Sequence, residues 1–209
     1  MKITLITSNQ KKHNHFVNLL SNYCDKLYVI QENDTIFPGV LDGIYNSNNI
    51  TKNYFRNVFK AQEKIFGKKN YFINSKNISL LPIKFGDLNK LNLKNISNFL
   101  KSDFYIVYGS NYIKGPLVKF LVKRKAVNIH LGLSPFYMGT DCNFWALYDG
   151  NPHMVGATIH YLTDGLDNGD IVYHVMPKFY SNPFMLKMSS VNLSQYSICE
   201  RIKKKICLR

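Results

Sequence analysis

The sequence predicts an α/β fold in which helices flank one mostly parallel, twisted sheet. Its start reads as strand, helix and strand, because an apolar run at 2–8 is followed by helical spacing of apolar residues at 10–22 and by a second apolar run at 26–31. The order returns where a buried strand at 103–108 precedes a helix at 116–123. Strands that alternate with helices in this way are typical of Rossmann-like sheets.

The same spacing rules predict the remaining elements, namely helices at 50–66 and 95–100 and strands at 80–83, 126–131, 155–162 and 171–176. Turn residues predict a loop at 33–49, and the tail from Asn192 to Arg209 is predicted to be a helix. The opening lacks a Gly-x-Gly-x-x-Gly turn, so a dinucleotide cofactor is not supported. With 209 residues, of which 45% are apolar, the chain can form one sizeable core. We therefore expect one main domain at 1–178 and a short helical C-terminal extension at 179–209.

The composition restricts the partners of this protein. The chain has 27 Lys and Arg against 13 Asp and Glu, which gives a formal net charge of +14. Such a charge suits anionic partners in general, nucleic acids among them. However, the sequence has no basic motif interleaved with aromatic residues and no known nucleic-acid module, so we do not expect a nucleic-acid partner.

Apolar runs and cysteines indicate the compartment. The N-terminal apolar run is too short for a signal peptide, and no run approaches the ~20 apolar residues of a membrane span. We therefore expect a cytoplasmic protein without a membrane partner. The chain shows no Cys-x-x-Cys pair or zinc-ligand spacing, so we expect no metal and reduced thiols at Cys24, Cys142, Cys199 and Cys207. Four histidines also lack metal-ligand spacing and are expected at the surface, namely His13, His15, His153 and His174.

Polar side chains mark one face of the predicted strand at 126–131. Asn128 and His130 are two residues apart and therefore point to the same face, while the apolar residues between and beside them point to the other. Gly132 ends the strand, so His130 lies near its carboxyl end, where open α/β sheets bind ligands. A Gly-containing turn after the strand at 155–162 then supplies Asp167. By residue type alone these groups could be a satisfied polar pair and a turn residue.

The order of the motifs favours a catalytic interpretation, because it resembles that of the folate-dependent formyltransferases. The pattern comprises Asn128, His130, Ser134-Pro135 and Gly139, followed by Gly156 to His160 and Gly165 to Asp170. This family includes glycinamide ribonucleotide transformylase, methionyl-tRNA formyltransferase and the N-formyltransferases of nucleotide-linked amino sugars. Residues 128–135 and 143–147 are most similar to the sugar enzymes. The other two enzymes typically have Ser-Leu-Leu-Pro where this chain has Gly132-Leu133-Ser134-Pro135, which counts against their substrates.

The resemblance implies a formyltransferase-type catalytic domain at 1–178 that moves a formyl group from N10-formyltetrahydrofolate to the amine of a nucleotide-linked amino sugar. A dTDP-4-amino-4,6-dideoxyhexose is one such substrate. In the implied roles, Asn128 donates a hydrogen bond to the developing oxyanion, and His130 acts as a base or as a charged oxyanion stabiliser. Asp167 either fixes the imidazole tautomer or passes protons through a bound water, and no metal is required. His160, on the preceding strand, is expected to have a structural role.

The resemblance also implies a folate site and leaves two alternatives open. The loop at 109–115 is expected to line the pterin pocket, and the implied cofactor-binding residues are Ser110, Tyr112, Ile113, Lys114, Gly165 and Asp167. A positive field would suit both the polyanionic folate and a nucleotide-linked sugar. The alternatives are a formyltransferase for another amine, such as glycinamide ribonucleotide, and a non-catalytic protein that binds folate or a nucleotide-linked sugar. A homodimer is left open as the assembly.

Overall fold

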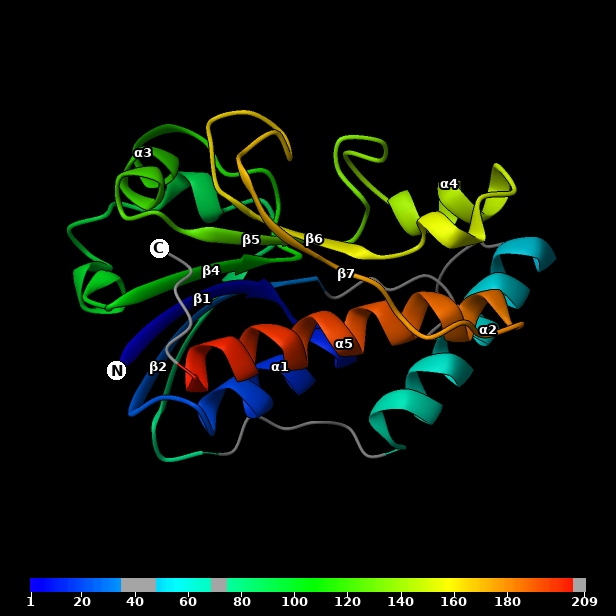
Figure 1. Ribbon diagram of the computed structural model, residues 1–209. Coiled ribbons are helices and arrows are strands. Elements are labelled where there is room, and N and C mark those ends of the chain that lie inside the picture. Colours follow the sequence, from blue (N-terminus) through cyan, green and yellow to red (C-terminus); the bar gives the residue numbers. More distant parts are fainter. Residues whose placement is uncertain (35–47, 69–74, 205–209) are drawn as a thin grey trace.

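The structure, a computed structural model, describes residues 1–34, 48–68 and 75–204 (Figure 1). Within these residues one seven-stranded sheet has the order β3-β2-β1-β4-β5-β6-β7. Its strands are β1 (Lys2–Ser8), β2 (Lys26–Asn33), β3 (Ile78–Lys84), β4 (Phe104–Tyr108), β5 (Val127–His130), β6 (Ala157–Tyr161) and β7 (Ile171–Val175). The pairs from β3 to β5 are parallel, whereas β6 and β7 are antiparallel to their neighbours. The predicted mostly parallel α/β sheet is confirmed.

The helices cover both faces of this sheet. They are α1 (Lys11–Ser21), α2 (Asn49–Phe66), α3 (Gly115–Lys123), α4 (Cys142–Tyr148) and α5 (Pro183–Lys203), with short 3₁₀ turns at Leu88–Lys90, Ser97–Leu100 and Pro152–Met154. α1 and α5 lie side by side on one face, and α3 lies on the other (Figure 1). Parallel neighbours need such crossover connections, because a tight turn can join only antiparallel strands.

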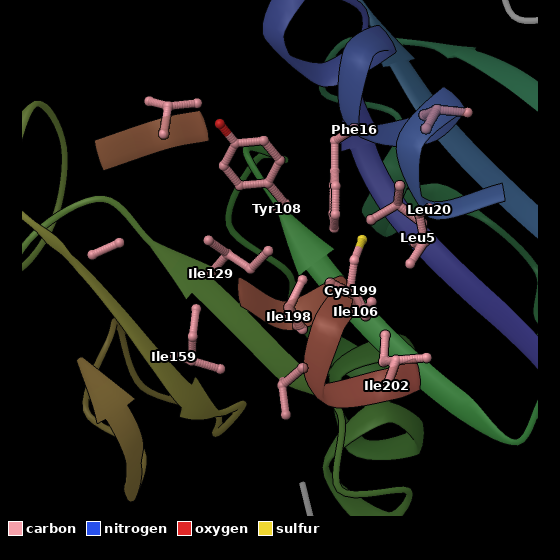
Figure 2. Close-up of a cluster of buried hydrophobic side chains, with 14 of the residues drawn as sticks. Leu5, Phe16, Leu20, Ile106, Tyr108, Ile129, Ile159, Ile198, Cys199 and Ile202 are labelled. Carbon is pink, nitrogen blue, oxygen red and sulfur yellow. The ribbon is translucent and has the colours of Figure 1, made fainter. Parts of the chain in front are cut away.

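Alternating side chains of the strands build a core on each face. On β4, Ile106 and Tyr108 pack toward α1 and α5, while Tyr105 and Val107 pack toward α3. Figure 2 shows the first of these cores, in which side chains of β1, β4, β5 and β6 meet those of α1 and α5. Each fully buried Leu, Ile or Phe there contributes ~1.5–3 kcal/mol relative to an exposed one.

Helix α5 belongs to this core and starts well before the predicted tail helix. Val191, Ile198 and Ile202 are buried against the sheet. The helix begins at Pro183 because the side chain of Asn182 accepts a hydrogen bond from the Met185 N–H at 3.0 Å, and proline is well suited to the first helical position. The predicted helix is confirmed over 192–203, whereas residues 205–209 lie outside the described residues.

Two further predictions were wrong. The segment at 95–100 forms only a 3₁₀ turn, because Thr4 and Tyr105 donate side-chain hydrogen bonds to the carbonyls of Phe99 and Leu100 that a longer helix would use. His13 is buried, with 3% of its surface exposed, since α1 turns it toward the sheet beside Tyr108.

Some predictions fall partly outside the described residues. Cys24, Cys142 and Cys199 are free thiols, but Cys207 lies outside, as does most of the predicted loop at 33–49. Across the described ranges, we find no helix with both the length and the apolar character needed to span a membrane. Those ranges also contain no cluster of three or more His, Cys, Asp or Glu side chains suited to a metal ion.

Candidate active site

The antiparallel pairing of β5 with β6 sets the polar face of the candidate site. Asn128 lies opposite His160, and His130 lies opposite Thr158. The alternate residues Val127 and Ile129 are buried in the core, so the predicted orientation of β5 is confirmed. The amide and imidazole therefore lie side by side at the carboxyl end of a strand whose other face is anchored.

The turn after β6 brings Asp167 to this face. Asp167 has a left-handed backbone conformation with φ 48°, which a residue with a side chain rarely adopts. Gly169 lets this turn pack closely because it has no Cβ. A Cβ at this position would lie only 1.8 Å from the carbonyl oxygen of Tyr161. The Gly139 N–H donates a hydrogen bond to Asp167 Oδ2 at 3.0 Å. Two loops thus hold the carboxylate over β5.

His130 and Asp167 form a buried ion pair. The Nδ1 atom of His130 lies 3.1 Å from Asp167 Oδ2, and the two side chains are only 5% and 9% exposed. Its Nε2 atom lies 2.8 Å from the carbonyl oxygen of Tyr137. Both ring nitrogens face oxygen acceptors, so both carry a proton. His130 is therefore an imidazolium in this arrangement.

The surroundings shift the pKa of both partners in opposite directions. Burial alone would lower the pKa of His130, but the hydrogen bonds to Asp167 and Cys142 and the charge of Asp167 raise it to about 10. Burial would likewise raise the pKa of Asp167, but the hydrogen bond and charge of His130 and the hydrogen bond from the Gly139 N–H hold that pKa well below its ordinary value. The pair is charged at neutral pH.

Asn128 completes the group through two contacts of its side-chain nitrogen. The Nδ2 atom donates to Asp167 Oδ1 at 3.1 Å and lies 3.1 Å from His160 Nε2. His160 Nδ1 lies 2.9 Å from the carbonyl oxygen of Tyr161 and donates to it, so Nε2 is left as an acceptor. The carboxylate also decides the orientation of the amide, because the Asn128 oxygen would repel it. A substrate oxygen must displace one of these internal partners.

The loops predicted to bind folate meet beside Asp167. The hydroxyl of Tyr112 donates to the carbonyl of Asp164, and the Lys114 ammonium lies 5.2 Å from the centre of the Tyr112 ring. Ile113 is buried, and the Ser110 hydroxyl donates to the carbonyl of Asn111 at 3.1 Å. The Gly165 N–H donates to the Thr163 hydroxyl at 3.3 Å. The two loops are thus in contact. The Tyr112 side chain is 40% exposed and is therefore accessible to a ligand.

Two side chains that sequence reasoning missed shape the first of these loops. Asn89 accepts from the Lys114 N–H at 2.7 Å and donates to the Tyr112 carbonyl at 2.8 Å. Glu32, fully buried at the end of β2, accepts from the Gly86 N–H at 3.0 Å and from the Asn111 N–H at 2.6 Å. The Lys114 N–H has one proton and already uses it, so a pterin must read other groups of this loop.

Replacing Asn89 with alanine should loosen this loop. Loss of two exposed hydrogen bonds should lower the free energy of unfolding by about 1–2 kcal/mol. The loop should also lose its shape, and the Kd for tetrahydrofolate, measured by calorimetry, should rise about tenfold, which corresponds to ~1.4 kcal/mol. Asn98→Ala, at an exposed position on the neighbouring 3₁₀ turn, serves as the control. Unchanged folate binding in Asn89→Ala would show that the Asn89 hydrogen bonds do not maintain a folate-binding shape of the loop.

The ion pair also predicts how stability depends on pH. The pKa of His130 is raised from about 6.5, so its contribution is full below pH ~6.5 and is lost as pH rises through 10. The pKa of Asp167 is lowered, so its contribution is present above pH ~4 and is lost in stronger acid. Between pH ~6.5 and pH ~9 the contribution of the pair to the free energy of unfolding should fall by on the order of 3 kcal/mol.

Urea unfolding of the wild-type protein and of His130→Gln measures this loss. The difference in unfolding free energy between the two proteins should be largest near pH ~5.5 and should shrink toward pH ~9. Other titrating groups affect both proteins alike, so the difference isolates His130. A difference that stays constant over this range would show that the histidine is not charged.

Comparison with known proteins identifies the segment that carries these residues. The formyl transferase family model matches residues 90–181. Phosphoribosylglycinamide formyltransferase from Bacillus halodurans superimposes with a TM-score of 0.62 at 16% identity, over 100% of this chain and 96% of that one. A sugar N-formyltransferase from Shewanella sp. gives 0.56 at 16% identity, over 98% of this chain and 69% of that one. A 4-N formyltransferase from Francisella tularensis gives 0.57 at 16% identity with the same two coverages, 98% and 69%.

These comparisons bear on two predictions. The solved structures share the Rossmann-like formyltransferase fold, which confirms the fold class. Asn128, His130 and Asp167 all lie within the matched segment, as does the loop at 109–115. The resemblance seen in the sequence is thereby confirmed: residues 90–181 match the formyl transferase family model, and the whole chain shares the fold of the solved formyltransferases.

Proposed function

We propose that this protein is an N-formyltransferase that moves a formyl group from N10-formyltetrahydrofolate to the amine of a nucleotide-linked amino sugar. The observation that carries the proposal is the gathering of Asn128, His130 and Asp167 within hydrogen-bonding distance at the end of β5, inside the formyl transferase segment. The preference for a sugar rests on the resemblance of residues 128–135 and 143–147 to the sugar enzymes. The net charge of +14 suits two anionic reactants.

The reaction needs donors for an oxygen that becomes negative. The folate supplies the formyl carbon. As the acceptor amine bonds to this carbon, the bond from carbon to the folate nitrogen breaks, and the proton lost by the amine ends on that nitrogen. The protons on His130 Nε2 and Asn128 Nδ2 are the donors nearest the strand end. One such donor contributes about 3–4 kcal/mol to stabilising the transition state.

The protonation of His130 supports one of its two implied roles. A doubly protonated ring has no lone pair with which to accept the amine proton. We therefore assign His130 as the charged oxyanion stabiliser and Asp167 as the group that keeps the imidazolium charged and oriented. To reach a substrate, Nε2 must exchange the Tyr137 carbonyl for the substrate oxygen.

The described folate loops fit the co-substrate named here. Tyr112 and Lys114 offer a flat ring and a cation beside Asp167, which suit a planar pterin and an anionic tail. Residues 112–114 and Gly165 would hold the pterin edge through peptide groups other than the Lys114 N–H. This arrangement would place the formyl group near His130.

Glycinamide ribonucleotide is the second candidate acceptor. The B. halodurans phosphoribosylglycinamide formyltransferase superimposes with a TM-score of 0.62 and the Shewanella sugar enzyme with 0.56, so the fold is compatible with either acceptor. Against glycinamide ribonucleotide stands Gly132-Leu133-Ser134-Pro135, which departs from the Ser-Leu-Leu-Pro of that enzyme class. We therefore place the sugar first.

An acceptor panel tests the proposal. The protein is incubated with N10-formyltetrahydrofolate and with several nucleotide-linked amino sugars, or with glycinamide ribonucleotide, and products are analysed by mass spectrometry. A formyl group added to an amino sugar supports the proposal, whereas addition only to another amine overturns the sugar assignment. Folate binding without any turnover would indicate a non-catalytic binding protein.

A further inference from the structure

A cavity of about 710 Å³ lies between the first turns of α2 and the start of α5. Its volume is in the range of small-molecule sites, which is about 300–1,000 Å³. Its lining includes two amides (Asn49 and Asn53), two cations (Lys52 and Arg56) and two aromatic rings (Tyr54 of α2 and Phe184 of α5). The catalytic residues Asn128, His130 and Asp167 are not among its lining residues.

The polar lining follows one face of α2. Positions 49, 52, 53, 56 and 57 recur at the three- and four-residue spacing that puts helical side chains on one side. No ion pair within the described ranges involves Lys52 or Arg56, and α2 has no acidic residue in its first turn. The cavity therefore presents two uncompensated cations, which suit a phosphate-bearing ligand.

The cavity lining also includes two aromatic side chains, Tyr54 of α2 and Phe184 of α5. The ring of Tyr54 lies 5.6 Å from that of Phe184 and 6.0 Å from that of Phe144, both edge to face. These neighbours hold the Tyr54 ring in place, so it can serve as a flat surface for a nucleobase. The amides of Asn49 and Asn53 both donate and accept hydrogen bonds, as the edges of a base require.

A chain of contacts links the cavity to the catalytic loop. Lys187 of α5 lies with its Nζ atom 3.5 Å from the Tyr54 hydroxyl and 3.3 Å from Asp141 Oδ1. Asp141 precedes α4 and lies two residues after Gly139, whose N–H binds Asp167. The cavity and the ion pair are therefore joined by one set of side-chain and backbone contacts.

The geometry points to this cavity as the site for the nucleoside diphosphate part of the acceptor. The base lies against Tyr54 and Phe184, and the phosphates lie against Lys52 and Arg56. This inference rests on the proposed function for the identity of the acceptor, but the cavity can be tested without any transfer reaction.

The experiment measures binding of dTDP and UDP by isothermal titration calorimetry to the full chain. The double variant Lys52→Ala, Arg56→Ala should raise the Kd for both nucleotides at least tenfold, and Phe184→Leu should raise it several-fold. The matched control Lys64→Ala removes a cation from the far end of the same helix and should leave the Kd unchanged. Circular dichroism checks that each variant is folded, which is expected because Lys52 and Arg56 form no ion pair with any residue that the structure describes. Equal nucleotide affinity in wild type and double variant, or no nucleotide binding by the wild type, overturns the inference.

Steady-state kinetics separates this inference from the proposed function. If the protein formylates a nucleotide-linked amino sugar, the double variant should raise KM for that sugar about tenfold at nearly constant kcat, since the cavity is remote from the reacting atoms. Formylation with an unchanged KM would overturn the inference that the nucleotide binds in the cavity, and the proposed formyltransferase function would still hold. Nucleotide binding that depends on Arg56, without formylation of any sugar, supports the cavity and overturns the function.

Discussion

Replacing His130 with alanine should lower kcat/KM for formyl transfer by about 10³-fold. The variant loses the charged donor to the developing oxyanion, and a single such donor accounts for about 10²–10³ in rate. Release of tetrahydrofolate, followed spectroscopically under saturating and limiting acceptor, gives kcat and kcat/KM. His153→Ala, an exposed histidine on the 3₁₀ turn before β6, should retain wild-type rates.

A second variant guards against loss of the fold. Removing His130 leaves the Asp167 carboxylate buried without its main partner, which can cost about 3–5 kcal/mol. His130→Gln can still donate a hydrogen bond to that carboxylate but carries no charge. We expect it to unfold at higher urea concentration than the alanine variant and to be almost as slow. Turnover near the wild-type rate in folded His130→Gln would refute the assigned role.

Asp167→Asn should be the next most damaging change, with kcat/KM falling by about 10²-fold near pH 8. The neutral amide cannot hold the imidazolium, so the pKa of His130 should fall from about 10 toward or below its ordinary value. The wild-type rate should therefore remain flat with rising pH until near 10, whereas the rate of the variant should already decline above pH ~6.5.

The pH profile distinguishes this positioning role from a merely structural one. Partial recovery of Asp167→Asn below pH ~6 is expected, because the imidazolium then forms without help from the carboxylate. Asp170→Asn, in the same turn but exposed, is the control. NMR titration of the His130 ring protons reports its pKa directly. An unshifted His130 pKa in Asp167→Asn would show that the carboxylate does not maintain the charge.

The parts of the site that could be predicted are those that depend only on residues close together in the sequence. Alternation along β5 gave the shared face of Asn128 and His130, and the Gly-rich turn gave Asp167. Periodicity likewise predicted the strands and the helices α1, α2 and α3. These features depend on residues a few positions apart, where backbone geometry alone decides which side chains share a face.

The parts that could not be predicted depend on contacts between distant segments. Glu32 and Asn111 are 79 residues apart in the chain, and nothing near Glu32 marks it as a partner for a loop N–H. Asn89 is recognisable only once its amide is seen against Lys114, and His160 only once β6 is paired with β5. The start of α5 lies at Asn182-Pro183, a pair as typical of a turn as of a helix start, so the sequence alone does not distinguish the two.

The hydrogen bond from Tyr112 to the Asp164 carbonyl joins the loop proposed to bind the one-carbon donor to the turn that bears Asp167. We therefore expect the two loops to move together, so that a ligand bound to the first loop also restrains the second. In kinetic terms we expect sequential addition with the donor entering first, because a donor bound to the first loop would restrain the turn that carries Asp167 before the acceptor arrives.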